Sequence, residues 1–171
     1  AEEIGRKIAA ANLADIFAMG GKPKYLTVAM SATGNEEFEW MLGIARGIAH
    51  EAQIVGAQVI GGDLTKGEKI VISITAIGDC KNAILRSGAK VGDSIYVTTL
   101  PGWSAAGLIA LQREIRGGLI DVAISEHRTP TINYEHAKKF AVGANSLCDI
   151  SDSLMIQGAQ MAEASGVQFL I

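Results

Sequence analysis

The strongest constraint on the fold is one segment in which an apolar run gives way to two glycines and an acid, Ala57-Gln-Val-Ile-Gly-Gly-Asp-Leu-Thr65. The β-branched Val59 and Ile60 predict a buried strand. The glycines predict that this strand breaks where the backbone closely approaches another group. We expect Asp63 at the strand's end, where its carboxylate could hold Mg²⁺ while the glycine amides face a phosphate. Taken alone, Gly-Gly-Asp favours an ordinary turn instead.

Composition bounds the class of protein. A length of 171 residues suits one ordinary domain, or one small domain plus part of a second. A content of 49% hydrophobic and 19% charged residues is typical of a soluble globular protein. The net charge of -3 offers no basic surface for a nucleic acid.

The sequence also bears on the compartment and the chain ends. No apolar span is long enough for a membrane helix, and no signal-peptide pattern opens the chain. The two cysteines, Cys80 and Cys148, lie far apart without histidines at ligand spacing, which predicts reduced thiols in a cytoplasmic protein. Because the chain starts at Ala1 without an initiator Met and stops at Ile171 inside an expected strand, we interpret both ends as cuts.

The first half of the chain alternates helical and strand-like segments. Helical spacing of apolar residues predicts helices over 4–19 and 35–53, the second with Asn35 as its N-cap. Strands are expected over 25–30 and 70–77 besides the central one, and residues 57–77 are expected to form a hairpin-like pair. This order predicts an α+β layer with helices on one face of a sheet.

A polar connector at residues 78–82 predicts a domain boundary. Beyond it we expect a strand over 95–99 and a helix of small residues over 104–111, whose side chains permit a close approach to a sheet. Residues 112–134 are polar and show little pattern. A helix is expected from about 152 to 164, capped by Ser165-Gly166, and the alternation over 167–171 opens a strand.

Acidic residues at expected element ends are the candidate site: Asp15, Asp63, Asp149 and Asp152. Asp15 is also interpretable as a solvated residue on a polar helix face, and Ser151 as a simple N-cap. Oxygen ligands without the Cys and His of a zinc site indicate Mg²⁺, and glycine-flanked Mg²⁺ suggests a phosphorylated ligand. The sequence has no Walker motif and no protein-kinase loop set.

Several segments follow one another as in thiamine-monophosphate kinase, and the chain resembles that family over nearly its whole length. They are Asn12-Leu-Ala-Asp-Ile-Phe-Ala-Met-Gly20, Ile60-Gly-Gly-Asp-Leu-Thr65, Leu85-Arg-Ser-Gly-Ala-Lys-Val-Gly-Asp93, Ser104-Ala-Ala-Gly-Leu108 and Asp149-Ile-Ser-Asp-Ser-Leu154. The resemblance implies the aminoimidazole ribonucleotide synthetase-like fold. It implies an N-terminal α+β domain over 1–80, with the ATP and Mg²⁺ site and a dimerisation sheet, and a truncated α/β domain over 81–171.

The activity that this resemblance implies is transfer of the ATP γ-phosphoryl group onto thiamine monophosphate, a step of thiamine biosynthesis that gives thiamine diphosphate. The family holds Mg²⁺ at the positions of Asp15, Asp63, Asp149 and Asp152. Its ATP contacts match Gly62, Asp63, Arg86 and Ser151. Such catalysis depends on positioning and charge neutralisation, so no further catalytic residue is expected. The family also implies a homodimer.

Some positions depart from the family pattern: Ala45, Leu64, Trp103 and Ser153. Ser153 stands where glycine is usual and could crowd the helix start, and Ala45 would remove a nucleotide contact. The family's N-terminal Gly-Asp-Asp and Thr-Thr-Asp ligands and its C-terminal part are absent from this sequence. If the sequence is the entire molecule, we expect weak or no kinase activity.

Two alternatives remain at this point. One is another ATP-using enzyme of the same fold: aminoimidazole ribonucleotide synthetase, selenophosphate synthetase, or the maturation protein that dehydrates a carbamoyl group for hydrogenases. The other is a non-catalytic truncated remnant.

Overall fold

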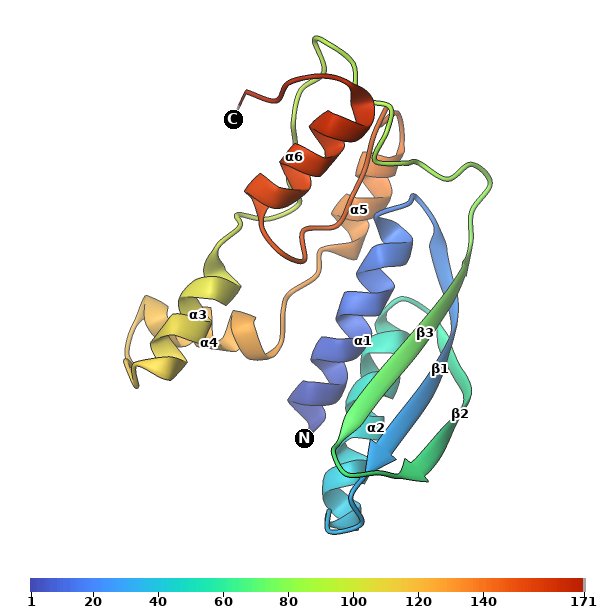
Figure 1. Ribbon diagram of the computed structural model, residues 1–171, viewed down its shortest axis with the longest axis vertical. Coiled ribbons are helices and arrows are strands. Elements are labelled where there is room, and N and C mark those ends of the chain that lie inside the picture. Colours follow the sequence, from blue (N-terminus) through green and yellow to red (C-terminus); the bar gives the residue numbers. More distant parts are fainter. Residues whose placement is uncertain (171) are drawn as a thin grey trace. The chain divides into compact units, whose positions relative to one another are not determined.

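The computed structural model describes residues 1–170 and divides the chain into two compact units (Figure 1). Unit 1 comprises Ala1–Ile16 and Lys22–Asp79. Unit 2 comprises Phe17–Gly21 and the chain from Cys80 onward.

Unit 1 contains a three-stranded sheet of β1 (Lys22–Ala32), β2 (Gln58–Lys66) and β3 (Val71–Asp79) in the order β2-β1-β3. β1 pairs in parallel with β2 and antiparallel with β3. The predicted hairpin over residues 57–77 is therefore wrong, because β1 lies between the two strands. Their connection passes the end of β1, where the Gly67 amide donates to the Ala32 carbonyl at 2.8 Å.

β2 does not break at its glycines, so the prediction that Asp63 ends the strand is also wrong. The register with β1 shifts between Leu26 and Thr27 and then continues to the Ala32–Lys66 pair. A Cβ on Gly62 would meet the Val28 carbonyl of β1. Glycine at position 62 thus allows a close approach of two strands, and the continuous ladder carries Asp63 into the strand interior.

Helices α1 (Glu2–Phe17) and α2 (Phe38–Ile54) cover one face of this sheet (Figure 1). Along β3, Ile72, Ile74 and Ala76 are half-buried while Val71 and Ile77 are exposed. That alternation identifies the face turned toward the helices. The core residues include Leu13, Leu26, Ile44, Ile48 and Ala52. The predicted α+β layer is confirmed.

The start of α2 differs from the expected N-cap at Asn35. The N-cap residue is Glu37, and its side chain makes no capping hydrogen bond. Glu36 instead accepts hydrogen bonds from the Thr33 hydroxyl at 2.8 Å and from the Gly34 amide at 3.0 Å. The Thr33 hydrogen bond is the main reason why the pKa of the Glu36 carboxyl is lowered. These contacts close the turn before the helix.

Unit 2 contains α3 (Trp103–Gln112), α4 (Leu119–Arg128), α5 (Tyr134–Ala141) and α6 (Leu154–Ser165). The sequence predicted α3 and α6 but neither α4 nor α5. The small residues of α3 pack on a helix instead of the expected sheet, since a Cβ on Gly107 would meet the Ala123 carbonyl of α4. Gly166 ends α6 in the left-handed conformation at φ 66°, which confirms the predicted C-cap.

Residues 95–99 and 167–170 form no strand in the described part of the chain, contrary to prediction, and Ile171 lies outside it. A β-branched run becomes a strand only when a neighbouring strand supplies ladder partners. Within the described residues 80–170 of unit 2 no strand is present to do so. Among residues 1–170, no helix is long and apolar enough to cross a membrane.

Candidate functional site

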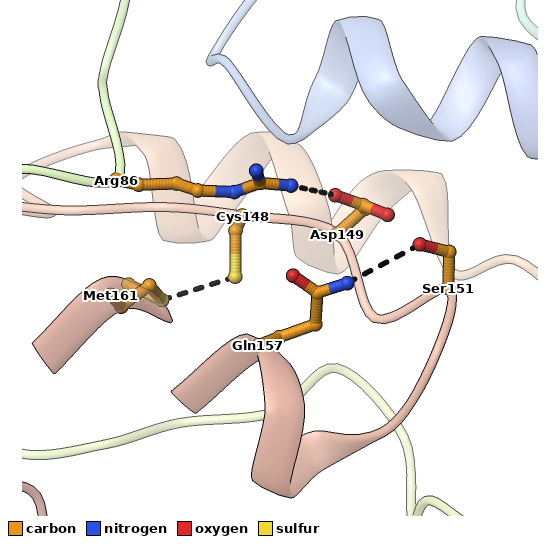
Figure 2. Close-up of polar contacts among 6 residues, drawn as sticks. All are labelled: Arg86, Cys148, Asp149, Ser151, Gln157 and Met161. Carbon is orange, nitrogen blue, oxygen red and sulfur yellow. Dashed lines mark hydrogen bonds and ion pairs between the residues drawn. The ribbon is translucent and has the colours of Figure 1, made fainter. Parts of the chain in front are cut away.

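Unit 2 brings together two of the predicted site residues, Arg86 and Asp149. The Arg86 guanidinium donates through one Nη atom to Asp149 Oδ1 at 3.1 Å. The Asp149 side chain is 15% exposed and the Arg86 side chain 48% exposed. A planar guanidinium held beside a mostly buried carboxylate leaves further N–H donors that can face an anionic oxygen. Figure 2 shows this pair.

The loop that carries Arg86 is joined to the segment that carries Asp149. The Leu147 amide donates to the Leu85 carbonyl at 3.2 Å. Farther along the loop, Asp93 accepts from the Lys90 amide at 2.8 Å and from the Asn145 side-chain amide at 3.0 and 3.1 Å. These hydrogen bonds, first that of the Lys90 amide, lower the pKa of the Asp93 carboxyl. These hydrogen bonds fix the backbone of residues 85–93 against that of residues 145–147.

Ser151 does not cap α6, so that alternative is wrong. The N-cap is Ser153, whose hydroxyl accepts from the Ile156 amide at 3.1 Å. Asp149 and Asp152 therefore precede the helix, and Ser153 stabilises the helix start instead of crowding it. Ser151 accepts from the Gln157 side-chain amide at 3.4 Å.

Gln157 is a buried polar residue of α6 that the sequence analysis did not single out. It is 3% exposed, and its Oε1 has no hydrogen-bond partner among the described residues. Figure 2 shows its amide nitrogen directed at Ser151. The side chain thereby links the helix to the loop before it. A single Gln inside an apolar helix face gives no local signal of this role.

Cys148 is a half-buried thiol that packs against α6. Its Sγ lies 3.0 Å from Met161 Sδ, as Figure 2 shows. Burial raises the pKa of the Cys148 thiol, and the neighbouring Asp149 carboxylate raises it further. A thiol with a raised pKa is a poor nucleophile at neutral pH, so this residue has a packing role.

Three of the predicted site residues, Asp15, Gly62 and Asp63, lie in unit 1. Asp15 is an exposed residue of α1, and Asp63 is an exposed residue of β2 that accepts from the Leu64 amide at 3.0 Å. Gly62 packs against β1 as described above. Asp152, in unit 2, is exposed. The candidate acids are thus divided between the two units.

Carboxylate oxygens are the ligands that Mg²⁺ prefers, so the donor chemistry of these acids fits that ion. Among residues 1–170, however, no three His, Cys, Asp or Glu side chains form a group that could hold a metal ion. Protein sites for Mg²⁺ commonly supply one or two carboxylates and take the remaining ligands from substrate phosphates and water. Within the described residues, each unit by itself therefore supplies isolated carboxylates and no preformed metal site.

Comparison with known proteins identifies sequences and structures that this chain resembles. Residues 1–80 match the family described as AIR synthase related protein, N-terminal domain. The thiamine-monophosphate kinase of Aquifex aeolicus is 30% identical over 172 residues, which cover 99% of this chain and 56% of that protein. The Mycobacterium tuberculosis enzyme of the same name is 37% identical, over 98% of this chain and 50% of its own.

This chain is similar to the thiamine-monophosphate kinases over nearly its whole length. A crystal structure of the Aquifex aeolicus thiamine-monophosphate kinase superposes with a TM-score of 0.91 over 96% of this chain and 57% of that one. A structure described as AaThiL complexed with AMPPCP and TMP gives a TM-score of 0.92, with 30% identity over 96% of this chain and 54% of that one. The predicted fold is therefore confirmed.

The thiamine-monophosphate kinase relatives are longer than this chain, which spans about half the length of those it matches. A hydrogenase maturation protein HypE in complex with ATP is 17% identical with a TM-score of 0.76, a likeness of fold alone. Both sequence identity and TM-score are higher for the thiamine-monophosphate kinases, at 30% and 0.91 for the Aquifex aeolicus structure, than for HypE.

Proposed function

We propose that this protein catalyses the ATP-dependent phosphorylation of thiamine monophosphate to thiamine diphosphate, as a phosphotransferase with a phosphate group as acceptor. One observation carries the proposal: the chain matches thiamine-monophosphate kinases along nearly its whole length in both sequence and fold. The relative with a TM-score of 0.92 is described as a complex with AMPPCP and TMP, an ATP analogue and the corresponding acceptor.

The proposed nucleotide contacts are Gly62, Asp63, Arg86 and Ser151. In support, Arg86 is half-exposed and presents N–H donors beside Asp149. A planar guanidinium can donate two parallel hydrogen bonds to phosphate oxygens. Asp15, Asp63, Asp149 and Asp152 are the proposed Mg²⁺ ligands. When bound, Mg²⁺ would neutralise negative charge on the phosphates and help to orient them.

The function is tested by calorimetry with AMPPCP and Mg²⁺, and by ADP release in the presence of thiamine monophosphate. We expect Mg²⁺-dependent AMPPCP binding and turnover with thiamine monophosphate. Asp149→Asn should lower kcat/KM about 100-fold or more, because it weakens charge stabilisation of the transferring phosphoryl group. Asp121→Asn on α4 is the matched control and should leave kcat/KM unchanged.

Two results would contradict this function. Turnover with aminoimidazole ribonucleotide precursors or selenide, but not with thiamine monophosphate, would assign the protein to a sibling activity. Absence of AMPPCP binding at millimolar concentration would favour the non-catalytic remnant.

We further propose that the sheet of unit 1 forms a homodimer contact. β2 is an edge strand whose residues are all exposed, including the apolar Val59, Ile60 and Leu64. On the sheet face that the helices do not cover, Val71 is 58% exposed. Unpaired edges and open apolar faces favour association with another chain.

Sedimentation velocity tests this contact. We expect a dimer at micromolar concentration and a shift toward monomer in Leu64→Lys, since a buried ammonium opposes association. A wild-type chain that sediments only as a monomer at these concentrations would refute the contact.

A further inference from the structure

The Arg86 backbone is held by two serines that come from distant parts of unit 2. The Arg86 carbonyl accepts from the Ser146 hydroxyl at 2.7 Å and from the Ser165 hydroxyl at 3.1 Å. Ser146 Oγ also lies 3.0 Å from the Leu85 carbonyl. The carbonyl of the residue that faces Asp149 thus has both of its lone pairs engaged.

Ser165 does more than contact this carbonyl. Its Oγ accepts from the Gly88 amide and from the Ala89 amide, each at 3.1 Å, while its proton goes to Arg86. A serine hydroxyl has one donor and two acceptor positions, so its hydrogen-bonding capacity is used completely. The backbone from Arg86 to Ala89 is folded around this one oxygen atom.

The hydrogen bonds of Ser165 to Arg86, Gly88 and Ala89, which we call the Ser165 clamp, attach the Arg86 loop to α6. Ser165 is the last residue of α6, and the helix begins directly after the Asp149-Ile-Ser-Asp-Ser segment (Figure 1). The same helix therefore adjoins the acidic segment at one end and holds the Arg86 loop at the other. Arg86, from this loop, forms its ion pair with Asp149, from the acidic segment (Figure 2).

We propose that Ser165 is a positioning residue that acts through Arg86. Its hydroxyl sets the backbone of residues 86–89 so that the guanidinium meets Asp149 and, in the proposed kinase, presents its remaining donors to a nucleotide phosphate. The second part rests on the proposed function, whereas the first part does not. Alanine at position 165 would leave the Gly88 and Ala89 amides without this acceptor, and the Arg86 carbonyl would keep only its hydrogen bond from Ser146.

The first test is independent of nucleotide. NMR spectra of the wild-type chain, Ser165→Ala, Ser165→Thr and the control Ser125→Ala report amide exchange at Gly88 and Ala89 and the Arg86 Nε–H signal. We expect exchange at least about tenfold faster and a shifted Arg86 signal in Ser165→Ala, with Ser165→Thr close to wild type because its hydroxyl is retained. Wild-type exchange and an unshifted Arg86 signal in Ser165→Ala would overturn the proposal.

The second test measures AMPPCP affinity by calorimetry with Mg²⁺. Ser165→Ala should weaken binding about two- to tenfold, and Ser165→Thr should restore it. In an Arg86→Ala background the Ser165 substitution should have no further effect, since residues that act through one another are not additive. Equal weakening by Ser165→Ala in both backgrounds would refute action through Arg86. If no variant and no wild-type chain binds AMPPCP, the proposed function fails, and the NMR readout alone decides the role of Ser165.

Discussion

At the scale of single residues, Ser153 departs from the family pattern and caps the N-terminus of α6. Glycine is usual at this position in the family that the sequence resembles, so a serine was predicted to crowd the helix start. The hydroxyl instead accepts from the Ile156 amide and satisfies a backbone donor that the helix cannot. This side chain thus contributes to the stability of α6.

Substitution of Ser153 should follow the known energetics of helix caps. We expect Ser153→Ala to lower the free energy of unfolding by about 1 kcal/mol, and Ser153→Gly by only a few tenths. Urea denaturation followed by far-UV circular dichroism measures both. Ser153→Thr keeps the hydroxyl acceptor and is the matched control. If Ser153→Thr lowered the free energy of unfolding as much as Ser153→Ala, the capping role of Ser153 would be contradicted.

Asp93 gives a prediction for the dependence of stability on pH. Hydrogen bonds from the Lys90 amide and the Asn145 side chain lower the pKa of its carboxyl in the folded state. A group with a lowered folded-state pKa adds stability above its unfolded-state pKa, and that contribution is lost as pH falls through the folded value. The difference in Tm between wild type and Asp93→Asn should therefore be largest near neutral pH and shrink in acid.

Thermal unfolding from neutral to strongly acidic pH checks this prediction. Asn145→Ala keeps the Asp93 carboxylate but removes one of its hydrogen-bond donors. This variant should therefore lose only part of the pH-dependent contribution of Asp93 to Tm. A Tm difference that stays constant across the range would show that Asp93 stabilises the loop without its charge.

At the scale of elements, substitution of the two glycines in β2 tests whether the close approach of two strands or ligand binding requires the Gly-Gly pair. A Cβ at position 62 meets the Val28 carbonyl, whereas a Cβ at position 61 meets nothing within 4 Å. We expect Gly62→Ala to destabilise the protein by about 1–3 kcal/mol, as overpacking typically does. Gly61→Ala, the matched control, should change stability by less than about 0.5 kcal/mol.

Urea denaturation followed by Trp40 fluorescence distinguishes the two variants. Equal stability of both would contradict the packing explanation for Gly62. A loss of AMPPCP binding in the Gly62 variant with unchanged stability would instead favour a direct contact with the nucleotide.

The elements that sequence patterns predicted well are those with strong periodicity or clear caps. α1, α2, α3 and α6 lie within a few residues of their predicted ranges, because spacing and terminal glycines are local signals. α4 and α5, of ten and eight residues, were missed because each is too short for helical periodicity to stand out. The strand predicted over 95–99 was wrong because strand formation depends on a partner that local sequence does not reveal.

At the scale of the whole molecule, the division into two units predicts separable effects of core substitutions. Leu13 is fully buried in unit 1. Leu13→Ala should cost about 2–5 kcal/mol, since it removes buried methyl groups and leaves a cavity. Each unit carries one tryptophan, Trp40 in α2 and Trp103 in α3, so fluorescence can report the units separately.

The measurement uses Trp103→Phe and Trp40→Phe backgrounds in urea. We expect Leu13→Ala to move the unfolding midpoint reported by Trp40 more than that reported by Trp103. Leu119→Ala, at a 73% exposed position of α4, is the control and should move neither. A larger shift in the Trp103 transition would contradict the assignment of Leu13 to the core of unit 1.

Sequence alone determined the α+β class and the principal helices, because periodicity and caps are properties of neighbouring residues. The residues of the candidate site stay a prediction from motif order. Tertiary structure alone decided the strand order, the packing reason for Gly62, the pairing of Arg86 with Asp149 and the clamp formed by Ser165. Each of these joins residues far apart in the chain. Local propensity does not specify such contacts, since they form only when folding brings distant segments to hydrogen-bonding distance.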